Sequence, residues 1–356
     1  PEFSPIQKAD NAYNPLSSLL PTYWFPVYLS QDKLTEVGFF TSGQDALATH
    51  QYMAQITYEQ QHKEPLLDFN YIYDGRWILG LQQALNTTNL SHVSEYSSQK
   101  FIAYMQPILN SENSYYPYAA YINSHTEFRF NQTNNFSGIE VDDNWLALGL
   151  IYDGLRRSLN SADASSGWQW GMSLEDADGA DNSRFYGQVF SLTVRNYQTF
   201  LSGNTVAQRL FMGVGLSSNS PFSLGGAVSD VYIGPGIQLK QRKFALRGFD
   251  TGQAELTADN ALIYSLEYRL PFTWVDHNII TPPVGFSGWS LRAFTDNGMA
   301  WYQDKSMGDV YSSIGGEVIL DTTVVYNFNL RFRVGVAKGI GSLGSEAVYV
   351  QLGGAF

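Results

Sequence analysis

The 356-residue sequence has no cysteine, few charged residues and no long hydrophobic run. Without cysteine, a disulfide framework and a thiolate metal site are excluded. Charged residues make up 15% of the chain, against about 25% in ordinary soluble domains. No segment reaches the roughly 18 apolar residues that a membrane-spanning helix requires, and the strongest candidate, residues 18–29, is broken by Pro21 and Pro26. If the chain crosses a membrane, it crosses as β-strands.

Basic residues and catalytic motifs are also scarce. The chain carries 21 Lys and Arg against 33 Asp and Glu, a net charge of -12. A nucleic-acid partner would require clustered basic residues to neutralise phosphates, so none is expected. The G-x-S-x-G segment of serine hydrolases is absent, and we expect neither an enzyme nor a bound metal or other cofactor.

Aromatic residues are abundant, at 15% of the chain. Together with the low charge, this composition is typical of a surface that faces lipid. Several aromatic residues lie near the ends of predicted strands, where amphipathic rings prefer the level of the lipid headgroups. These predicted anchors are Tyr23, Trp24, Trp145, Trp168, Trp170, Trp289 and Trp301.

Apolar residues recur with a period of two along the chain, which indicates strands. In residues 261–272, one face reads Leu262, Tyr264, Leu266, Tyr268, Leu270 and Phe272, and the other reads Ile263, Ser265, Glu267, Arg269 and Pro271. Residues 330–337 alternate in the same way. One face suits lipid and the other suits water, as in the wall of a water-filled membrane barrel.

About 16 strands are predicted, an even number as bacterial barrels require. They fall near residues 22–29, 35–43, 49–61, 64–74, 76–85, 97–108, 117–131, 143–155, 167–176, 186–199, 205–217, 260–272, 287–301, 312–325, 328–338 and 346–356. Pro26 interrupts the first of them, which leaves a count of 14 open. The predicted fold is all-β: a transmembrane antiparallel β-barrel.

The predicted domain organisation is a lead of residues 1–20 followed by one barrel domain, residues 21–356. Pro1 is not an initiator methionine, so we interpret the chain as a mature or excised fragment, and residues 1–3 are compatible with a tag remnant. Short connections such as residues 74–75 alternate with long ones such as 218–259, as expected for periplasmic turns and outer loops. The connection over residues 273–286 breaks this alternation, because it is long on the periplasmic side.

Four sequence elements occur in order in the second half of the chain. They are Phe244-Ala245-Leu246-Arg247-Gly248-Phe249, the strand Ser265-Leu266-Glu267-Tyr268-Arg269-Leu270-Pro271-Phe272, the strand Phe294-Thr295-Asp296-Asn297-Gly298, and a terminal Phe356. Over residues 205–356 the chain thereby resembles the outer membrane protein 85 superfamily of bacterial surface antigens, which includes BamA, TamA and the two-partner-secretion transporters. The N-terminal half resembles it mainly in strand pattern.

The resemblance implies a bacterial outer-membrane location and a terminal residue, Phe356, that the barrel assembly machinery recognises. It also implies that the long extracellular loop is folded into the lumen. Physical chemistry supports such a loop lock, because low-dielectric walls strengthen an arginine–carboxylate pair. We predict that Arg247, in the turn with Gly248 and Phe249, bonds to Asp296, Glu267 or both, and that replacing Arg247 raises conductance. The alternative is an ordinary exposed turn in which Gly248 supplies a positive φ.

Charged residues alternate along the inward faces of the last five predicted strands, four of each sign. Besides Glu267 and Asp296, the predicted lumen wall contains Arg269, Arg292, Glu317, Asp321, Arg331 and Arg333. The mixture indicates a balanced, hydrogen-bonded wall, although a substrate-conducting role stays open. The glycine-rich run at residues 339–344 has no helix after it to bind a dinucleotide, so we interpret it as a hairpin loop.

Relatives in the superfamily insert outer-membrane proteins or move polypeptides across the membrane, usually with soluble polypeptide-transport-associated domains before the barrel. About 20 residues precede the first strand, too few for one such domain, so we expect either that the domain was removed or that this member lacks it. The leading hypothesis is an assembly or translocation barrel that opens laterally between its first and last strands, where Gly353 and Gly354 would weaken the seam.

Two other functions stay open: a non-conducting membrane anchor or self-associating homo-oligomer, and a diffusion pore. The expected partners are outer-membrane lipid and lipopolysaccharide, the barrel assembly machinery, and an outer-membrane protein client or a periplasmic partner.

Overall fold

The structure is a computed structural model of the whole chain. It describes residues 14–16, 18–31, 34–87, 93–110, 113–130, 139–157, 164–177, 187–200, 203–217, 221–227, 239, 241–273, 277–280, 283–324 and 328–354. Phe356 therefore lies outside the described residues, as does most of the predicted lead.

Sixteen long antiparallel strands form the wall, which confirms the predicted fold class and strand number. They are β1 (Phe25–Gln31), β2 (Leu34–Gln44), β3 (His50–Glu59), β4 (Glu64–Tyr73), β5 (Trp77–Thr87), β6 (Val93–Met105), β8 (Ser114–Phe130), β9 (Ile139–Asp153), β11 (Ala164–Asp176), β12 (Gln188–Thr199), β13 (Thr205–Gly215), β17 (Asn260–Thr273), β19 (Pro283–Trp301), β20 (Tyr311–Val324), β21 (Phe328–Gly339) and β22 (Glu346–Gly354).

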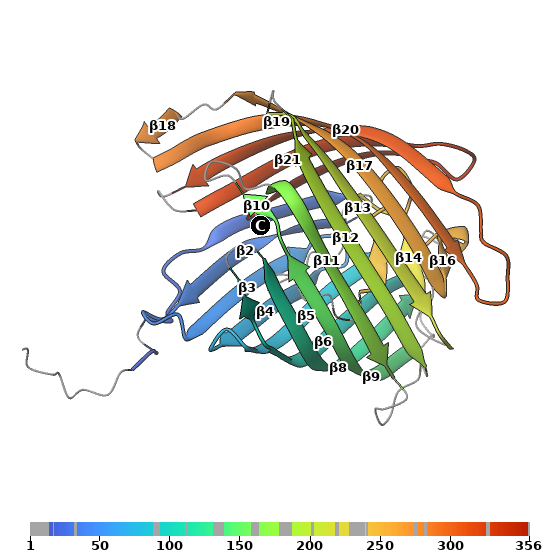
Figure 1. The fold of residues 1–356 in the computed structure, drawn as a ribbon, viewed down its shortest axis with the longest axis horizontal. Coiled ribbons are helices and arrows are strands. Elements are labelled where there is room, and N and C mark those ends of the chain that lie inside the picture. The colour runs from blue at the N-terminus through green and yellow to red at the C-terminus, as the bar shows by residue number, and fades with distance from the viewer. Residues whose placement is uncertain are drawn as a thin grey trace, which may run out of the picture.

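Each of these strands pairs with the next along the chain, and β1 pairs with β22, so the sheet closes into a barrel (Figure 1). A closed sheet satisfies its backbone hydrogen bonds without a free edge, as a hydrocarbon environment requires. No helix in the described residues is long and apolar enough to cross a membrane.

The period-two pattern sorts the side chains of each strand between two faces. On β17 the outward Tyr264 and Tyr268 are exposed, whereas the inward Ile263 is buried. Outward apolar side chains on other strands are exposed to a larger fraction, 62% for Leu148 and 69% for Val348. A continuous outer surface of this kind is stable against lipid and unfavourable in water.

Three short strands extend the wall: β7 (Ile108–Leu109), β10 (Arg156–Arg157) and β18 (His277–Ile280). β18 forms a hairpin with the first residues of β19, where His277 pairs with Phe286 and Ile280 with Pro283. The prediction of one long connection over residues 273–286 was therefore wrong. Much of that segment is strand, and register shifts at Pro271/Thr273 and Phe286/Gly288 accompany the extension.

A small sheet forms within the connection between β13 and β17, which we call the long loop. It contains β14 (Phe222–Leu224), β15 (Lys243–Phe244) and β16 (Thr257–Ala258), and the short 3-10 helix η1 (Ala254–Leu256) directly precedes β16. Phe222, Leu224, Leu246 and Phe249 of the loop are almost fully buried, and they belong to one apolar cluster with inward residues of the wall. Phe244 stacks on Phe211 of β13, with ring centroids 3.6 Å apart.

Candidate functional site

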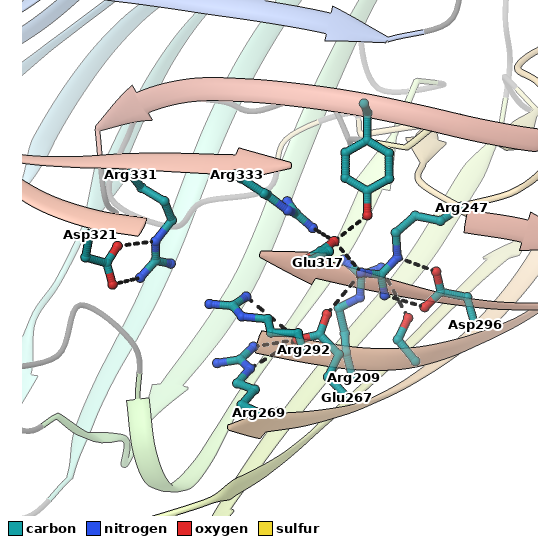
Figure 2. Close-up of polar contacts among 12 residues, drawn as sticks. Arg209, Arg247, Glu267, Arg269, Arg292, Asp296, Glu317, Asp321, Arg331 and Arg333 are labelled. Carbon is teal, nitrogen blue, oxygen red and sulfur yellow. Dashed lines mark hydrogen bonds and ion pairs between the residues drawn. The ribbon is translucent and has the colours of Figure 1, made fainter. Parts of the chain in front are cut away.

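Arg247 of the long loop is buried against the inner wall and meets three carboxylates (Figure 2). Its Nε and Nη2 donate to the two oxygens of Asp296 on β19, at 2.6 and 2.7 Å. Its Nη1 donates to Glu267 of β17 at 3.3 Å and to Glu317 of β20 at 2.9 Å. The fork-shaped guanidinium thus uses all its nitrogens, in the bidentate geometry that makes arginine–carboxylate bonds strong.

The environment of Arg247 favours its charge. Burial alone disfavours the charged form, but the bonds to Asp296 and the nearby Glu267 and Glu317 outweigh it and raise the pKa of Arg247 well above its ordinary value. The guanidinium carbon also lies 3.4 Å from the centroid of the Phe294 ring, a cation–π contact that closes one face of the group.

Glu317 is a second centre of the site. It accepts from Arg333 at 2.5 Å and from the hydroxyl of Tyr349 at 2.5 Å, in addition to Arg247. Strand register explains the arrangement, because Glu317 pairs with Gly335 and Gly335 pairs with Tyr349. A Cβ on Gly335 would lie 2.2 Å from the Tyr349 ring, so only glycine lets that ring cross β21 to reach Glu317.

Gly248 sets the turn that presents Arg247. Its φ is +86°, in the left-handed region that favours glycine, and a Cβ there would lie 2.5 Å from the backbone nitrogen of Gly339 on β21. The Gly248 carbonyl accepts from the backbone N–H of Ser345, at 2.8 Å. The turn therefore packs against the hairpin loop at residues 339–345, and Phe249 beside it is 1% exposed.

The remaining predicted wall residues all face inward from the last strands (Figure 2). Arg331 makes two bonds to Asp321, at 2.8 and 3.0 Å. Arg269 bonds to Glu267, with a shortest distance of 2.8 Å, and Arg292 lies 3.9 Å from Glu267. The structure thus brings Arg247, Glu267, Asp296 and Glu317 into direct contact, with Arg269, Arg292 and Arg333 beside them, and holds Arg331 and Asp321 as a separate pair.

Sequence reasoning missed a second attachment of the loop. Arg242 donates to Glu175 of β11 at 2.5 Å, and both side chains are buried. The Arg242 guanidinium also lies 5.2 Å from the ring centroids of Trp145 and of Phe222. Trp145 of β9 is 0% exposed, so its prediction as a headgroup anchor was wrong: it points inward and packs against this arginine.

Lys243 adds a third contact on another strand. Its Nζ lies 3.0 Å from Glu95 of β6, a residue 148 positions away in sequence. The sequence around Glu95 and Glu175 does not predict a contact with the long loop, because neither residue stands in a recognisable motif. The long loop therefore contacts β17, β19 and β20 through Arg247, and β6 and β11 through Lys243 and Arg242.

The predicted seam lies between β1 and β22. In the described residues the two strands share three register pairs, Tyr28 with Leu352, Leu29 with Gln351 and Ser30 with Val350. The neighbouring β1–β2 ladder extends over seven pairs. Gly353 and Gly354 pair with β21 only, at Arg331 and Leu330. In the described residues, the glycine pair thus lies just beyond the β1–β22 ladder.

Comparison with known proteins identifies the fold. No protein-family model and no curated protein matches the sequence. Solved structures that match 92% of the chain include BamA from Haemophilus ducreyi lacking POTRA domains 1–3 (13% identity, TM-score 0.57), CdiB from Acinetobacter baumannii (11%, 0.57) and CdiB from Escherichia coli (9%, 0.59). The match covers 68% of that BamA chain and 58% and 61% of the two CdiB chains.

At these identities the likeness shows the fold alone. Together with the apolar outer surface, it defines the class: the chain is a sixteen-stranded β-barrel of the bacterial outer membrane. Within that class its fold is similar to BamA and CdiB, which belong to the superfamily that the sequence motifs resemble.

Proposed function

We propose that this barrel inserts or translocates polypeptides at the outer membrane, with its lumen closed by the long loop. The observation that carries the proposal is the Arg247 site. The Arg-Gly-Phe turn, the Glu-Tyr-Arg strand and the Phe-x-Asp-x-Gly strand, which resemble superfamily motifs, meet there in one buried network. A guanidinium that is bonded at every nitrogen holds one loop position against alternatives.

The closure between β1 and β22 supports the same proposal. In the part of the chain that the structure describes, its three register pairs leave fewer backbone hydrogen bonds to break than the seven pairs between β1 and β2. A client strand could add to the edges exposed there by β-augmentation. Lateral opening is therefore easiest at this position of the wall.

The test is insertion of an unfolded eight-stranded outer-membrane barrel into phospholipid vesicles that contain this protein. The cysteine-free chain allows a disulfide between Ser30→Cys and Val350→Cys, which are direct cross-strand partners at the seam. The matched control joins Val336→Cys and Val348→Cys within the β21–β22 hairpin. We expect the wild type and the oxidised control to accelerate insertion and the oxidised seam variant to lose this activity, with recovery on reduction.

The second candidate is a non-conducting membrane anchor. The burial of the loop residues Phe222, Leu224 and Leu246 favours it, because an apolar cluster at this density leaves little room for solute. A wild type that neither accelerates insertion nor conducts in planar bilayers would support the anchor. Steady conductance with no effect on insertion would support a pore instead.

A further inference from the structure

Two inward-facing arginines outside the Arg247 site form no ion pair in the described part of the structure. Arg195 of β12 donates to the amide oxygen of Gln169 at 3.2 Å, and Arg209 of β13 donates to the hydroxyl of Ser265 at 3.4 Å. Both partners are neutral. Arg209 lies within the field of Asp296 and Glu267, but the oxygens of those carboxylates accept from Arg247 and Arg269.

Register places the two arginines directly opposite each other. Arg195 and Arg209 are Cα partners in the β12–β13 ladder, and both face the lumen. Like charges in this position repel and destabilise a sheet. A second like pair, Arg269 with Arg292, faces the same side from β17 and β19, but Glu267 lies between those two guanidinium groups. Arg195 and Arg209 have no such carboxylate among the described residues.

The local charge balance is also positive. The inward faces of β12, β13 and β17–β22, together with Arg247, carry seven arginines and four carboxylates, a difference of three positive charges. The arginines are 195, 209, 247, 269, 292, 331 and 333, and the carboxylates are 267, 296, 317 and 321. The whole chain carries -12, so this positive excess is opposite in sign to the net charge of the protein. The prediction of a balanced wall omitted Arg195 and Arg209.

We propose that Arg195 and Arg209 form a binding site for an oxyanion, a phosphate or a carboxylate group, on the lumen wall. Two planar guanidinium groups across one ladder offer paired donors that match the oxygens of such a group. Both side chains are partly exposed, so a small anion can contact them, and the low-dielectric wall strengthens the attraction. Gln169 and Ser265 orient the two arginines. The site stands on these contacts and does not rest on the proposed function.

Isothermal titration calorimetry on the full chain in a non-ionic detergent tests the proposal, with ionic strength held constant by chloride. Two probes are titrated: inorganic phosphate and a hexaglutamate peptide. We expect at least one of them to bind the wild type at one site per barrel. Binding of phosphate alone identifies a free oxyanion as the ligand, whereas tighter binding of the peptide identifies an acidic polypeptide segment.

Variants assign the binding to the two arginines. The double variant Arg195→Gln/Arg209→Gln should weaken binding by about a hundredfold, roughly tenfold for each charge-assisted contact. Arg195→Lys/Arg209→Lys keeps the charge but loses the planar fork, and should retain part of the affinity. Arg129→Gln is the matched control, because Arg129 on β8 already pairs with Glu64 and Glu127; its binding should stay within about twofold of the wild type.

Folding of each variant is checked by its β-type circular dichroism and its heat-dependent migration on gels. The lysine variant covers the case in which the glutamine variant fails to fold, because it preserves the charge of the wall. Absence of binding by both probes to the wild type would overturn the proposal. Unchanged affinity in a folded glutamine or lysine double variant would overturn it as well.

Discussion

The long loop is attached to two parts of the barrel wall by different chemistry. On the β17–β20 side, Arg247 is shared among Asp296, Glu267 and Glu317, and a glycine turn seats against the β21–β22 hairpin. On the β6 and β11 side, Arg242 and Lys243 each meet one carboxylate. The first attachment is a network and the second is a pair of separate contacts. Removing one arginine should therefore cost most where several carboxylates depend on it.

The largest effect is expected for Arg247→Ala. The change leaves the buried Asp296 and Glu317 without their shared cation, and breaking a buried ion pair costs about 3–5 kcal/mol. We expect a loss near the upper end of that range in a denaturant titration of the detergent-solubilised barrel, and a higher conductance in planar bilayers. Arg247→Lys should recover only part of the loss, because an ammonium cannot bond in bidentate fashion. Wild-type stability and conductance in Arg247→Ala would contradict the network interpretation.

A smaller effect is expected for Arg242→Met. One buried carboxylate, Glu175, loses its arginine, so we expect a loss of about 3 kcal/mol, at the lower end of the range for broken buried pairs. Replacing both partners, as Arg242→Met with Glu175→Leu, should restore most of the stability, because no uncompensated charge stays behind. The same denaturant titration measures both. If the double variant were less stable than the single one, the pair would not be the relevant interaction.

Gly248→Ala should weaken the packing of the Arg247 turn against β21 without removing any charge. The variant forces a left-handed residue to carry a Cβ against the Gly339 backbone, and we expect a loss of about 1–3 kcal/mol. Gly341→Ala is the matched control: its φ is +101°, yet a Cβ there would meet nothing within 4 Å. The difference between the two isolates the contact from the backbone strain. Equal losses in the two variants would mean that the packing of the turn against β21 contributes nothing to stability.

The smallest effect is expected for Lys243→Met. Lys243 and Glu95 are 27% and 20% exposed, so solvent screens the pair and we expect less than about 1 kcal/mol. The exposed pair Lys338–Glu346 supplies the control, and Lys338→Met should leave the unfolding midpoint unchanged. A loss for Lys243→Met that approached the one for Arg242→Met would show that the two contacts act as one network.

The two attachments also differ in how far sequence alone could predict them. Arg247, Asp296 and Glu267 stand in short motifs with a known order, and the period of two placed both carboxylates on one face. Glu317, which the sequence placed only in the wall, joins Arg247 because strand register sets it beside Gly335 and Tyr349. The strands themselves were predicted within a few residues, since alternation depends only on local side-chain chemistry.

What could not be predicted depends on which segments meet in the folded barrel. Trp145 is a residue type that often anchors a barrel at the lipid headgroups, and only its inward position beside Arg242 shows that it does not do so here. The segment over residues 273–286 has few apolar residues in alternation, and only its pairing with β19 identifies β18. Long-range partners such as Glu95 and Glu175 follow from the closure of the whole barrel, which no local pattern encodes.

The most direct test that the long loop reaches the β6 side of the barrel wall is crosslinking in membranes. Lys243→Cys and Glu95→Cys are introduced together into the cysteine-free chain, and a short bifunctional thiol reagent should join them. After crosslinking, a bulky membrane-impermeant maleimide should label the protein no more than it labels the cysteine-free wild type. The control pairs Glu95→Cys with Lys305→Cys, in the exposed connection after β19, and should not crosslink. Free labelling of position 243 by the bulky maleimide, with no crosslink to position 95, would contradict a loop that reaches the far wall.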